Sequence, residues 1–360
     1  MVLRKEPRGN GAAVTMADVA ARAGVSTSTA SLAFRTTGPI TEKTRARILA
    51  VAAEMGYSGP NPMAQSLKRG RSGIVGVVVA EQIRHAFHSP VTIATMDGLS
   101  EVLDTHGTGQ LLLPGGVDSD GRSSHLLDTM PLDAVVFLTR GEDFDRLIPR
   151  LVARRIPMVG IEGPHHAGVT LVEIDDARGM LELAQYVASL GHSRVGVVMR
   201  TTRLGESAAP GPVEPVDHNL DDIGNSTIRE RLRSVHSVFP DAVRVEAGGR
   251  DVEAGDEAAT VLLSRVIRPT ILMAQNDLLA AGALRAAARL GIRVPEDLSV
   301  TGFDGVALPW LTTRLTTVEQ PLQQRGREAG RMIGEILAGG TPDPVRLAVT
   351  LRPGDTTAPL

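Results

Sequence analysis

Four short hydroxyl side chains gather at the start of a predicted helix near the N-terminus. The helix is expected over about residues 27–35, after a turn that ends at Ser26, whose hydroxyl can cap its first turn. The four residues are Thr27, Ser28, Thr29 and Ser31. Because serine and threonine are only fair helix formers, their clustering indicates a role beyond helix stability, with solvated helix residues as the alternative. Short hydroxyls approach base edges and phosphates closely, and a helix N-terminus favours phosphate, so this chemistry suits contact with nucleic acid.

Two further helices are expected to hold this one in place. The first begins after Thr15, a capping residue, and ends at Gly24, which can adopt the left-handed conformation of a helix C-terminus. The third begins after Thr41 and ends at Gly56. Apolar residues recur at helical spacing along one face of each helix. Helix, three-residue turn with glycine, helix is the helix-turn-helix arrangement, although many helical hairpins of this form bind nothing.

Charge is distributed unevenly along the chain. Residues 1–70 contain ten Lys or Arg and four Asp or Glu, a net charge of +6. The net charge of −3 for the whole chain therefore leaves −9 on the remaining 290 residues. A basic head on an acidic body is expected when only the head meets a polyanion, and the alternative is a merely solvated basic segment.

Composition narrows the class of protein. A chain of 360 residues suits a small module followed by one or two larger domains. The longest apolar run, near 74–80, is long enough for a strand but not for a membrane span, and no secretory signal is recognisable. We therefore expect a cytoplasmic protein without a membrane partner. The chain has no cysteine, so neither disulfides nor thiolate chemistry are expected.

Motifs for catalysis and cofactor binding are missing from the sequence. It contains no GxxxxGK loop followed by Ser or Thr, no GxGxxG dinucleotide fingerprint and no HExxH metal motif. His165 and His166 lie in a Gly/Pro-rich loop, and the pairs Asp175-Asp176 and Asp221-Asp222 are interpreted first as helix caps and loop charges. We therefore expect no enzyme activity, no cofactor and no metal site.

The body of the chain alternates short apolar runs with amphipathic stretches. The runs begin at 74–79 and end at 298–303, and they fall into two sets divided near Met199. Continuous apolar strands alternating with helices indicate parallel sheets covered on both faces, here an α/β body of two Rossmann-like lobes. Ligands of such folds lie beyond the carboxyl ends of the strands.

The N-terminal segments resemble the DNA-binding head of the LacI/GalR family of transcriptional regulators. The resemblance is carried by residues 15–31, with the sequence TMADVAARAGVSTSTAS, by 40–57, and by 60–67 and 70–72. In that family the last two segments belong to a hinge helix that enters the minor groove at the operator centre. The resemblance implies that Leu67 wedges between base pairs there, and the alternative is an ordinary apolar linker residue.

The residues expected to contact DNA come from the helix-turn-helix and the hinge. They are Thr15, Ser26, Thr27, Ser28, Thr29, Ser31, Leu32, Arg35, Asn61, Ala64, Gln65, Leu67 and Lys68. Three positions depart from the family pattern, which usually has arginine at Leu32, asparagine at Arg35 and arginine at Gln65. Leucine cannot make the bidentate guanine contact that arginine makes, so we expect an operator unlike the family's commonest half-site.

The body also resembles this family, over a total span of roughly residues 15–350. The matching segments are Gly191-His192, Asn276-Asp277, 294–304 and 315–321. The resemblance implies two lobes like those of periplasmic sugar-binding proteins, which close on a small effector. It also implies a homodimer, with a higher oligomer as the alternative. Lobe closure would then change the placement of the two heads.

Six residues are candidates for contact with the effector. They are Phe87, Glu162, Arg231, Asp277, Asp304 and Trp310. Arg231 resembles an arginine that grips effector hydroxyls or carboxylate, and Asp277 an aspartate that accepts effector hydroxyls. The alternatives are an exposed base for Arg231, a helix cap for Asp277 and a strand end for Asp304. A sugar-like ligand is expected, yet the stretch Glu162-Gly163-Pro164 departs from the family pattern and the chain has few aromatic residues for stacking.

The expected organisation is a helix-turn-helix head with a hinge helix, followed by a two-lobed periplasmic-binding-protein-type domain. The expected boundaries are 1–14 for a flexible arm, 15–59 for the head, 60–72 for the hinge and linker, and 73–360 for the effector and dimerisation domain, whose lobes are about 73–175 plus 307–330 and about 176–306 plus 331–353. The stretch 201–224 is either a disordered insertion or a lid. A regulator with a lost effector pocket and a solute-binding protein are the alternatives in function.

Overall fold

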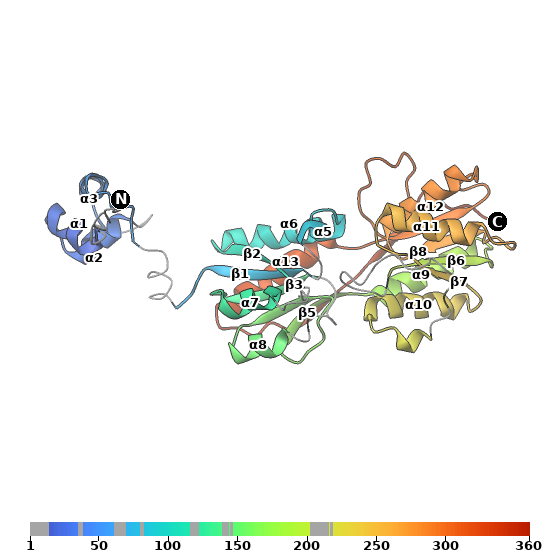
Figure 1. The fold of residues 1–360 in the computed structure, drawn as a ribbon, viewed down its shortest axis with the longest axis horizontal. Coiled ribbons are helices and arrows are strands. Elements are labelled where there is room, and N and C mark those ends of the chain that lie inside the picture. Colours follow the sequence, from blue (N-terminus) through green and yellow to red (C-terminus); the bar gives the residue numbers. More distant parts are fainter. Residues whose placement is uncertain are drawn as a thin grey trace, which may run out of the picture. The chain divides into compact units, whose positions relative to one another are not determined.

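The structure is a computed structural model of the chain. It describes residues 14–34, 39–60, 70–79, 83–115, 122–138, 144, 147–201, 216 and 219–360. The chain forms two compact units, Met1–Ser72 and Gly73–Leu360, each described here by itself (Figure 1). In its described part no helix is both long and apolar enough to cross a membrane.

The first unit is built from three short helices, each started by a side-chain cap. They are α1 (Met16–Ala23), α2 (Thr27–Ala33) and α3 (Glu42–Glu54). The caps are the expected ones: Thr15 forms a capping box with Asp18, Ser26 accepts from the main-chain N–H of Thr29, and Thr41 caps α3. Gly24, with φ of 64°, ends α1. Apolar side chains from all three helices form one small core, centred on Val19, Ala20, Ala30, Ala33, Ile48 and Ala52.

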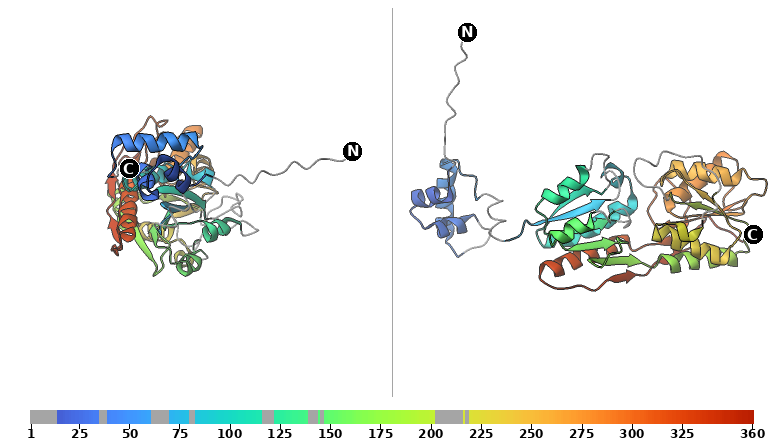
Figure 2. Two further views of the ribbon diagram at one scale, coloured as in Figure 1. Left: turned by 90° about the vertical axis from the view of Figure 1, so that its left-hand side faces the viewer. Right: turned by 60° about the horizontal axis from the view of Figure 1, so that its bottom comes forward.

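The second unit contains two six-stranded sheets, each covered by helices on both faces (Figures 1 and 2). The first sheet has the order β11-β5-β4-β3-β1-β2 and is parallel throughout. Its strands are β1 (Ile74–Val79), β2 (Gly109–Pro114), β3 (Ala134–Leu138), β4 (Met158–Ile161), β5 (Val169–Ile174) and β11 (Val345–Leu347). Helices α6 (Pro90–Thr105) and α13 (Leu322–Leu337) pack on one face, and α7 (Arg122–Thr129) and α8 (Ile148–Ala153) on the other. A short helix, α5 (Ile83–Ala86), follows β1.

The second sheet has the order β12-β10-β9-β8-β6-β7, and only β12 is antiparallel to its neighbour. Its strands are β6 (Val195–Met199), β7 (Val243–Glu246), β8 (Ile271–Ala274), β9 (Ser299–Asp304), β10 (Thr316–Glu319) and β12 (Thr350–Arg352). Helices α9 (Asp176–Ser189) and α10 (Ser226–Val238) cover one face, and α11 (Val252–Leu263) and α12 (Asp277–Arg289) the other. A 3-10 turn, η2 (Leu220–Asp222), precedes α10. The two helix-covered sheets, one parallel and the other parallel except for β12, confirm the expected fold class.

Within the described residues the chain passes between the two sheets three times. It does so between β5 and α9, between β10 and α13, and between β11 and β12. The expected division of the C-terminal part, 307–330 in the first lobe and 331–353 in the second, is therefore wrong. Strand β10 pairs with β9 in the second lobe, whereas α13 and β11 return to the first, as the red segments of Figure 2 show. Apolar periodicity cannot reveal which sheet a strand joins, because that depends on hydrogen bonds to distant strands.

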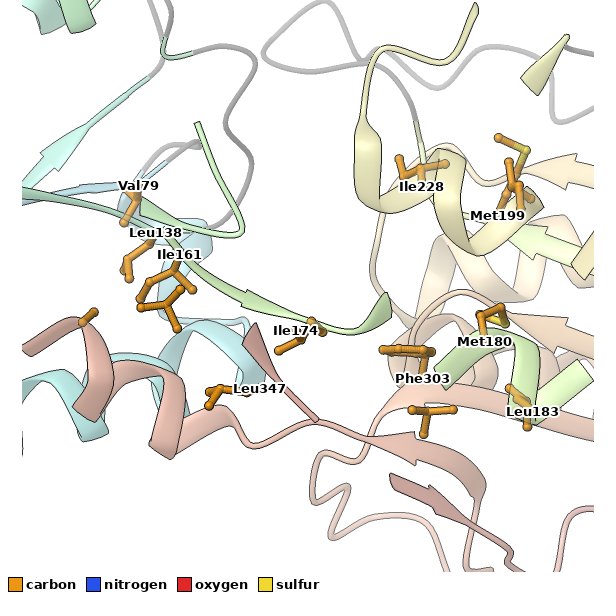
Figure 3. Packing of buried hydrophobic residues seen from close by; sticks show 14 of the residues in the cluster. Val79, Leu138, Ile161, Ile174, Met180, Leu183, Met199, Ile228, Phe303 and Leu347 are labelled. Atoms are coloured by element: carbon orange, nitrogen blue, oxygen red, sulfur yellow. The ribbon is translucent and has the colours of Figure 1, made fainter. Parts of the chain in front are cut away.

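One apolar cluster runs through both lobes across the crossing segments. Figure 3 shows Ile174 and Leu347, at two of the crossings, between the first-lobe side chains around Ile161 and the second-lobe side chains around Phe303 and Met180. These residues are buried. The crossings are therefore packed rather than loose, and the strand ends beside them have defined positions.

Candidate DNA-binding surface and interlobe site

The N-terminus of α2 presents hydroxyl groups to solvent. Ser26, Thr27 and Ser28 are exposed, and Thr29 and Ser31 are half-buried. Part of the cluster supports the helix itself: Ser26 Oγ lies 2.8 Å from both Ser28 Oγ and Thr29 Oγ1 and accepts from the Thr29 N–H at 3.1 Å. Thr27 is thus the most available hydroxyl of the cluster for an external partner.

The remaining predicted DNA contacts are only partly placed by the structure. Thr15 is exposed but its side chain is engaged with Asp18, and Leu32 is half-buried. Six predicted contacts lie outside the described residues: Arg35, Asn61, Ala64, Gln65, Leu67 and Lys68. Exposed cations on α1 and α3, namely Arg22, Lys43 and Arg47, were not among the predicted contacts, and they supply positive charge suited to phosphates.

In the second unit, polar side chains converge where strands of both sheets end. Glu162 follows β4, Asp176 follows β5, Arg200 follows β6 and Asp304 ends β9. Carboxyl ends of parallel strands are where ligands of such folds bind. Glu162 and Asp304 have φ angles of 62° and 129°, backbone conformations that cost about 1–3 kcal/mol and concentrate at binding sites. The described residues include no group of three or more potential ligands placed to hold a metal ion.

Arg231 of α10 is the most tightly held side chain of this site. Its Nε donates to Asp176 Oδ1 at 2.6 Å, and its Nη1 donates to the carbonyl oxygen of Gln275 at 2.6 Å. The guanidinium lies 3.5 Å from the centroid of the Phe303 ring, a cation–π contact. Burial raises the pKa of Asp176 to about 6, an effect that the positive charge of Arg231 opposes. The predicted effector residue therefore joins α9, α10 and the end of β8.

Arg325, at the start of α13, links the two lobes. Its Nε donates to Thr95 Oγ1 at 2.8 Å and its Nη1 to Gln320 Oε1 at 2.9 Å, and it also forms an ion pair with Glu162. Gln320 in turn donates to Asp304 Oδ1 at 2.6 Å. A hydrogen-bonded chain thus runs from Glu162 in the first lobe to Asp304 in the second. Burial raises the pKa of Asp304 to about 7 against the opposing charge of Arg231.

Asp277 is buried but is used by the chain itself in this conformation. Oδ1 accepts from the Thr317 hydroxyl at 2.6 Å, and Oδ2 accepts from the main-chain N–H of Val306 at 2.9 Å. Burial raises its pKa to about 6. A Cβ at Gly302 would lie 2.3 Å from Oδ1, so the close approach of β9 requires glycine there. These contacts favour a structural role, and effector contact by Asp277 stays a prediction.

The two predicted aromatic contacts are exposed side chains. Phe87, just after α5, and Trp310, in the loop after β9, are 57% and 59% exposed. In this conformation neither is a member of the buried network of Arg231 and Arg325. A small solvent-accessible hollow of about 20 Å³ does border it, lined among others by Glu162, Asp176 and Glu230.

Sequence reasoning missed three members of the network: Arg200, Gln320 and Arg325. Arg200 could have been predicted as a site residue, because it is a charged residue directly after a fully apolar strand. It therefore lies at the carboxyl end of that strand, where ligands bind. Nothing in the sequence distinguishes Arg325 as a site residue, because it is one of several charged residues on an amphipathic helix. Asp176 was interpreted as a helix cap, and the N-cap is its neighbour Asp175, which accepts from the Arg178 N–H.

Comparison with known proteins connects the two units to one class. Residues 15–61 match the family described as bacterial regulatory proteins, lacI family, and residues 184–357 match a periplasmic binding protein-like domain. An HTH-type transcriptional regulator of Mycolicibacterium smegmatis is 34% identical over 91% of this chain and 92% of its own. A helix-turn-helix joined to such a domain defines a class of DNA-binding transcriptional regulators.

Solved structures agree with this class. A lacI-family transcriptional regulator from Corynebacterium glutamicum is 25% identical with a TM-score of 0.70, covering 98% of this chain and 100% of its own. The lac repressor dimer bound to operator and the anti-inducer ONPF has the same fold, with a TM-score of 0.74, 22% identity and coverage of 96% and 99%. The chain belongs to the lacI family of transcriptional regulators. Its relatives are regulators rather than enzymes, as the missing catalytic motifs indicated.

Proposed function

We propose that this chain is a repressor that binds a pseudo-palindromic operator as a homodimer and changes its affinity when a small, sugar-like molecule binds between its lobes. The observation that carries the proposal is the interlobe network itself: two acids in strained backbone conformations, Glu162 and Asp304, are linked through Arg325 across the lobe boundary. A ligand that rearranged this network would change how the lobes close, which is how such folds transmit binding.

The DNA-binding half of the proposal rests on the first unit. Thr27 and Ser28 are exposed at a helix N-terminus, and the nearby cations Arg22, Lys43 and Arg47 suit the DNA backbone. Arg35 and Leu67 are proposed as a base contact and a minor-groove wedge from the family resemblance. A homodimer places two such heads on two half-sites, as in the lac repressor dimer on its operator, and a higher oligomer is compatible with the same contacts. Such a protein would act in the cytoplasm, where its operator lies.

The test is a fluorescence-anisotropy titration of the full chain against its own upstream DNA at two salt concentrations, with and without a panel of sugars, sugar phosphates and nucleobases. Tight binding that weakens steeply with salt and changes with one compound is the expected result, because several cations of each head displace counterions. Affinity independent of salt, or no preference over scrambled DNA, would contradict operator binding.

A regulator whose effector pocket is lost or atypical is the second candidate. It is favoured by Arg231 and Asp277, whose polar atoms bond to the chain's own groups. The same titration separates the two candidates, because this regulator would bind DNA tightly and respond to none of the compounds.

A further inference from the structure

Arg200 differs from the other arginines of the interlobe site in having no carboxylate partner among the described residues. It directly follows β6, and its main-chain N–H donates to Gln275 Oε1 at 2.9 Å. Its Nε is buried without a hydrogen-bond partner in the described part of the chain. Burial and the neighbouring cations Arg231 and Arg250 lower the pKa of Arg200 to about 10, so it is still charged at neutral pH.

The acids nearby are already engaged. Glu162 is paired with Arg325 and Asp176 with Arg231. Asp304 is the remaining acid within Coulombic range of Arg200, but burial raises its pKa to about 7, which weakens it as a counter-charge. Two ion pairs therefore account for two arginines, and Arg200 is left with the Coulombic attraction of Asp304 and Glu162 but no paired carboxylate among the described residues.

A second donor nearby is also unused. Arg325 is only 1% exposed, and its Nη2 is buried without a hydrogen-bond partner among the described residues. Arg200 and Arg325 both lie within Coulombic range of Asp304, and Arg325 is also connected to Asp304 by hydrogen bonds through Gln320. Buried guanidinium donors without partners are costly, and carboxylate or phosphate oxygens satisfy them best because they match the planar fork of donors.

We propose that the interlobe site takes a small anion that bears hydroxyl groups, a phosphorylated or carboxylated sugar, with its negative group on Arg200 and a hydroxyl donating to Asp304. The anion supplies the charge that Arg200 lacks, and Arg325 Nη2 offers it a second donor. A neutral sugar would leave Arg200 without a paired anionic group. This inference rests on the proposed effector site and specifies the class of its ligand.

The test measures binding by the full chain of glucose 6-phosphate, gluconate, inorganic phosphate and glucose, using isothermal titration calorimetry and thermal unfolding. Glucose 6-phosphate or gluconate should bind more tightly than inorganic phosphate, and glucose should bind weakest. R200Q should weaken anion binding at least about tenfold, the loss expected for a charge-assisted hydrogen bond. The matched control R178Q removes the same charge from a side chain that is 70% exposed, and it should bind as the wild type does.

The ligand-free melting temperature separates a binding role from a structural one. R200Q should melt at or above the wild-type temperature, because a half-buried cation without a paired carboxylate is removed. A melting temperature several degrees lower would show that Arg200 supports the fold and would overturn the proposal. Equal binding of glucose and the anions, or no binding of any probe, would overturn it too.

Operator binding is measured in parallel with the wild-type chain and no ligand. Failure of the wild type to bind its operator would contradict the proposed function while leaving the anion result valid. Normal operator binding together with failure of the anion test would overturn only the ligand class.

Discussion

Arg231 and Asp176 form an almost completely buried ion pair, with side chains 1% and 6% exposed and 2.6 Å between guanidinium nitrogen and carboxylate oxygen. The two residues are 55 positions apart in the chain and belong to neighbouring helices, α10 and α9. Removing one member of such a pair leaves an uncompensated buried charge, which costs more than the pair itself contributes. The pair therefore ties the candidate effector site to the stability of the second lobe.

Replacing Arg231 with methionine should lower the free energy of unfolding by about 3–5 kcal/mol, because Asp176 loses its counter-charge and Gln275 a donor. Urea unfolding followed by circular dichroism measures the change. Arg178→Met is the control: its ion pair with Glu182 is exposed, and such pairs are worth about 0–1 kcal/mol. Equal losses in the free energy of unfolding for the two substitutions would show that the buried ion pair matters no more to stability than the exposed one.

Asp304 should make stability depend on pH near neutrality. Burial raises its folded-state pKa to about 7 from its ordinary value of 3.8, so between these values the folded state holds a proton that the unfolded state has released. The stabilisation is complete below about pH 3.8 and is lost as the pH rises through 7. The wild-type melting temperature should therefore fall between pH 5 and pH 8 more steeply than that of Asp304→Asn.

Asp297 provides the control for this pH dependence. Hydrogen bonds from Arg293 lower its pKa to about 2 from 3.8, so its stabilisation is present above 3.8 and is lost only as the pH falls through 2. Asp297→Asn should therefore keep the wild-type slope between pH 5 and pH 8. Identical slopes for wild type and Asp304→Asn would mean that Asp304 ionises normally.

Gly326→Ala should force α6 and α13 apart. A Cβ at position 326 would lie 2.0 Å from the Thr95 carbonyl oxygen, and the neighbouring Arg325 donates to the Thr95 hydroxyl. Overpacking of this kind costs about 1–3 kcal/mol, visible as a lower urea midpoint. Gly109→Ala is the control, because the nearest atom to its Cβ would be at 3.6 Å, an ordinary contact. A midpoint unchanged in Gly326→Ala would show that the helices separate without cost.

Thr27→Ala should weaken operator binding about three- to tenfold, the loss of one neutral hydrogen bond, with little change in melting temperature. Ser26→Ala should instead lower helix stability by about 1 kcal/mol, because Ser26 caps α2. Anisotropy and thermal unfolding of both variants separate contact from capping, and Ser58→Ala, exposed in the same unit, is the control. Unchanged affinity of Thr27→Ala would remove Thr27 from the interface.

The local structure of this protein followed from the sequence alone. The caps Thr15, Ser26 and Thr41 and the left-handed Gly24 were predicted correctly because their hydrogen bonds join residues within a few positions of one another. Parallel sheets covered on both faces were predicted from unbroken apolar runs such as 74–79, which do not depend on the path of the chain.

Only the tertiary structure determined which side chains contact one another between the lobes. Glu162 and Arg325 are 163 positions apart, and they meet only because the chain returns to the first lobe after β10, a path that apolar periodicity does not encode. The lack of a paired carboxylate at Arg200 depends likewise on which neighbours have already paired. Long-range pairing follows from strand register and packing, so sequence could name Glu162, Arg231 and Asp304 as candidates but not the network that joins them.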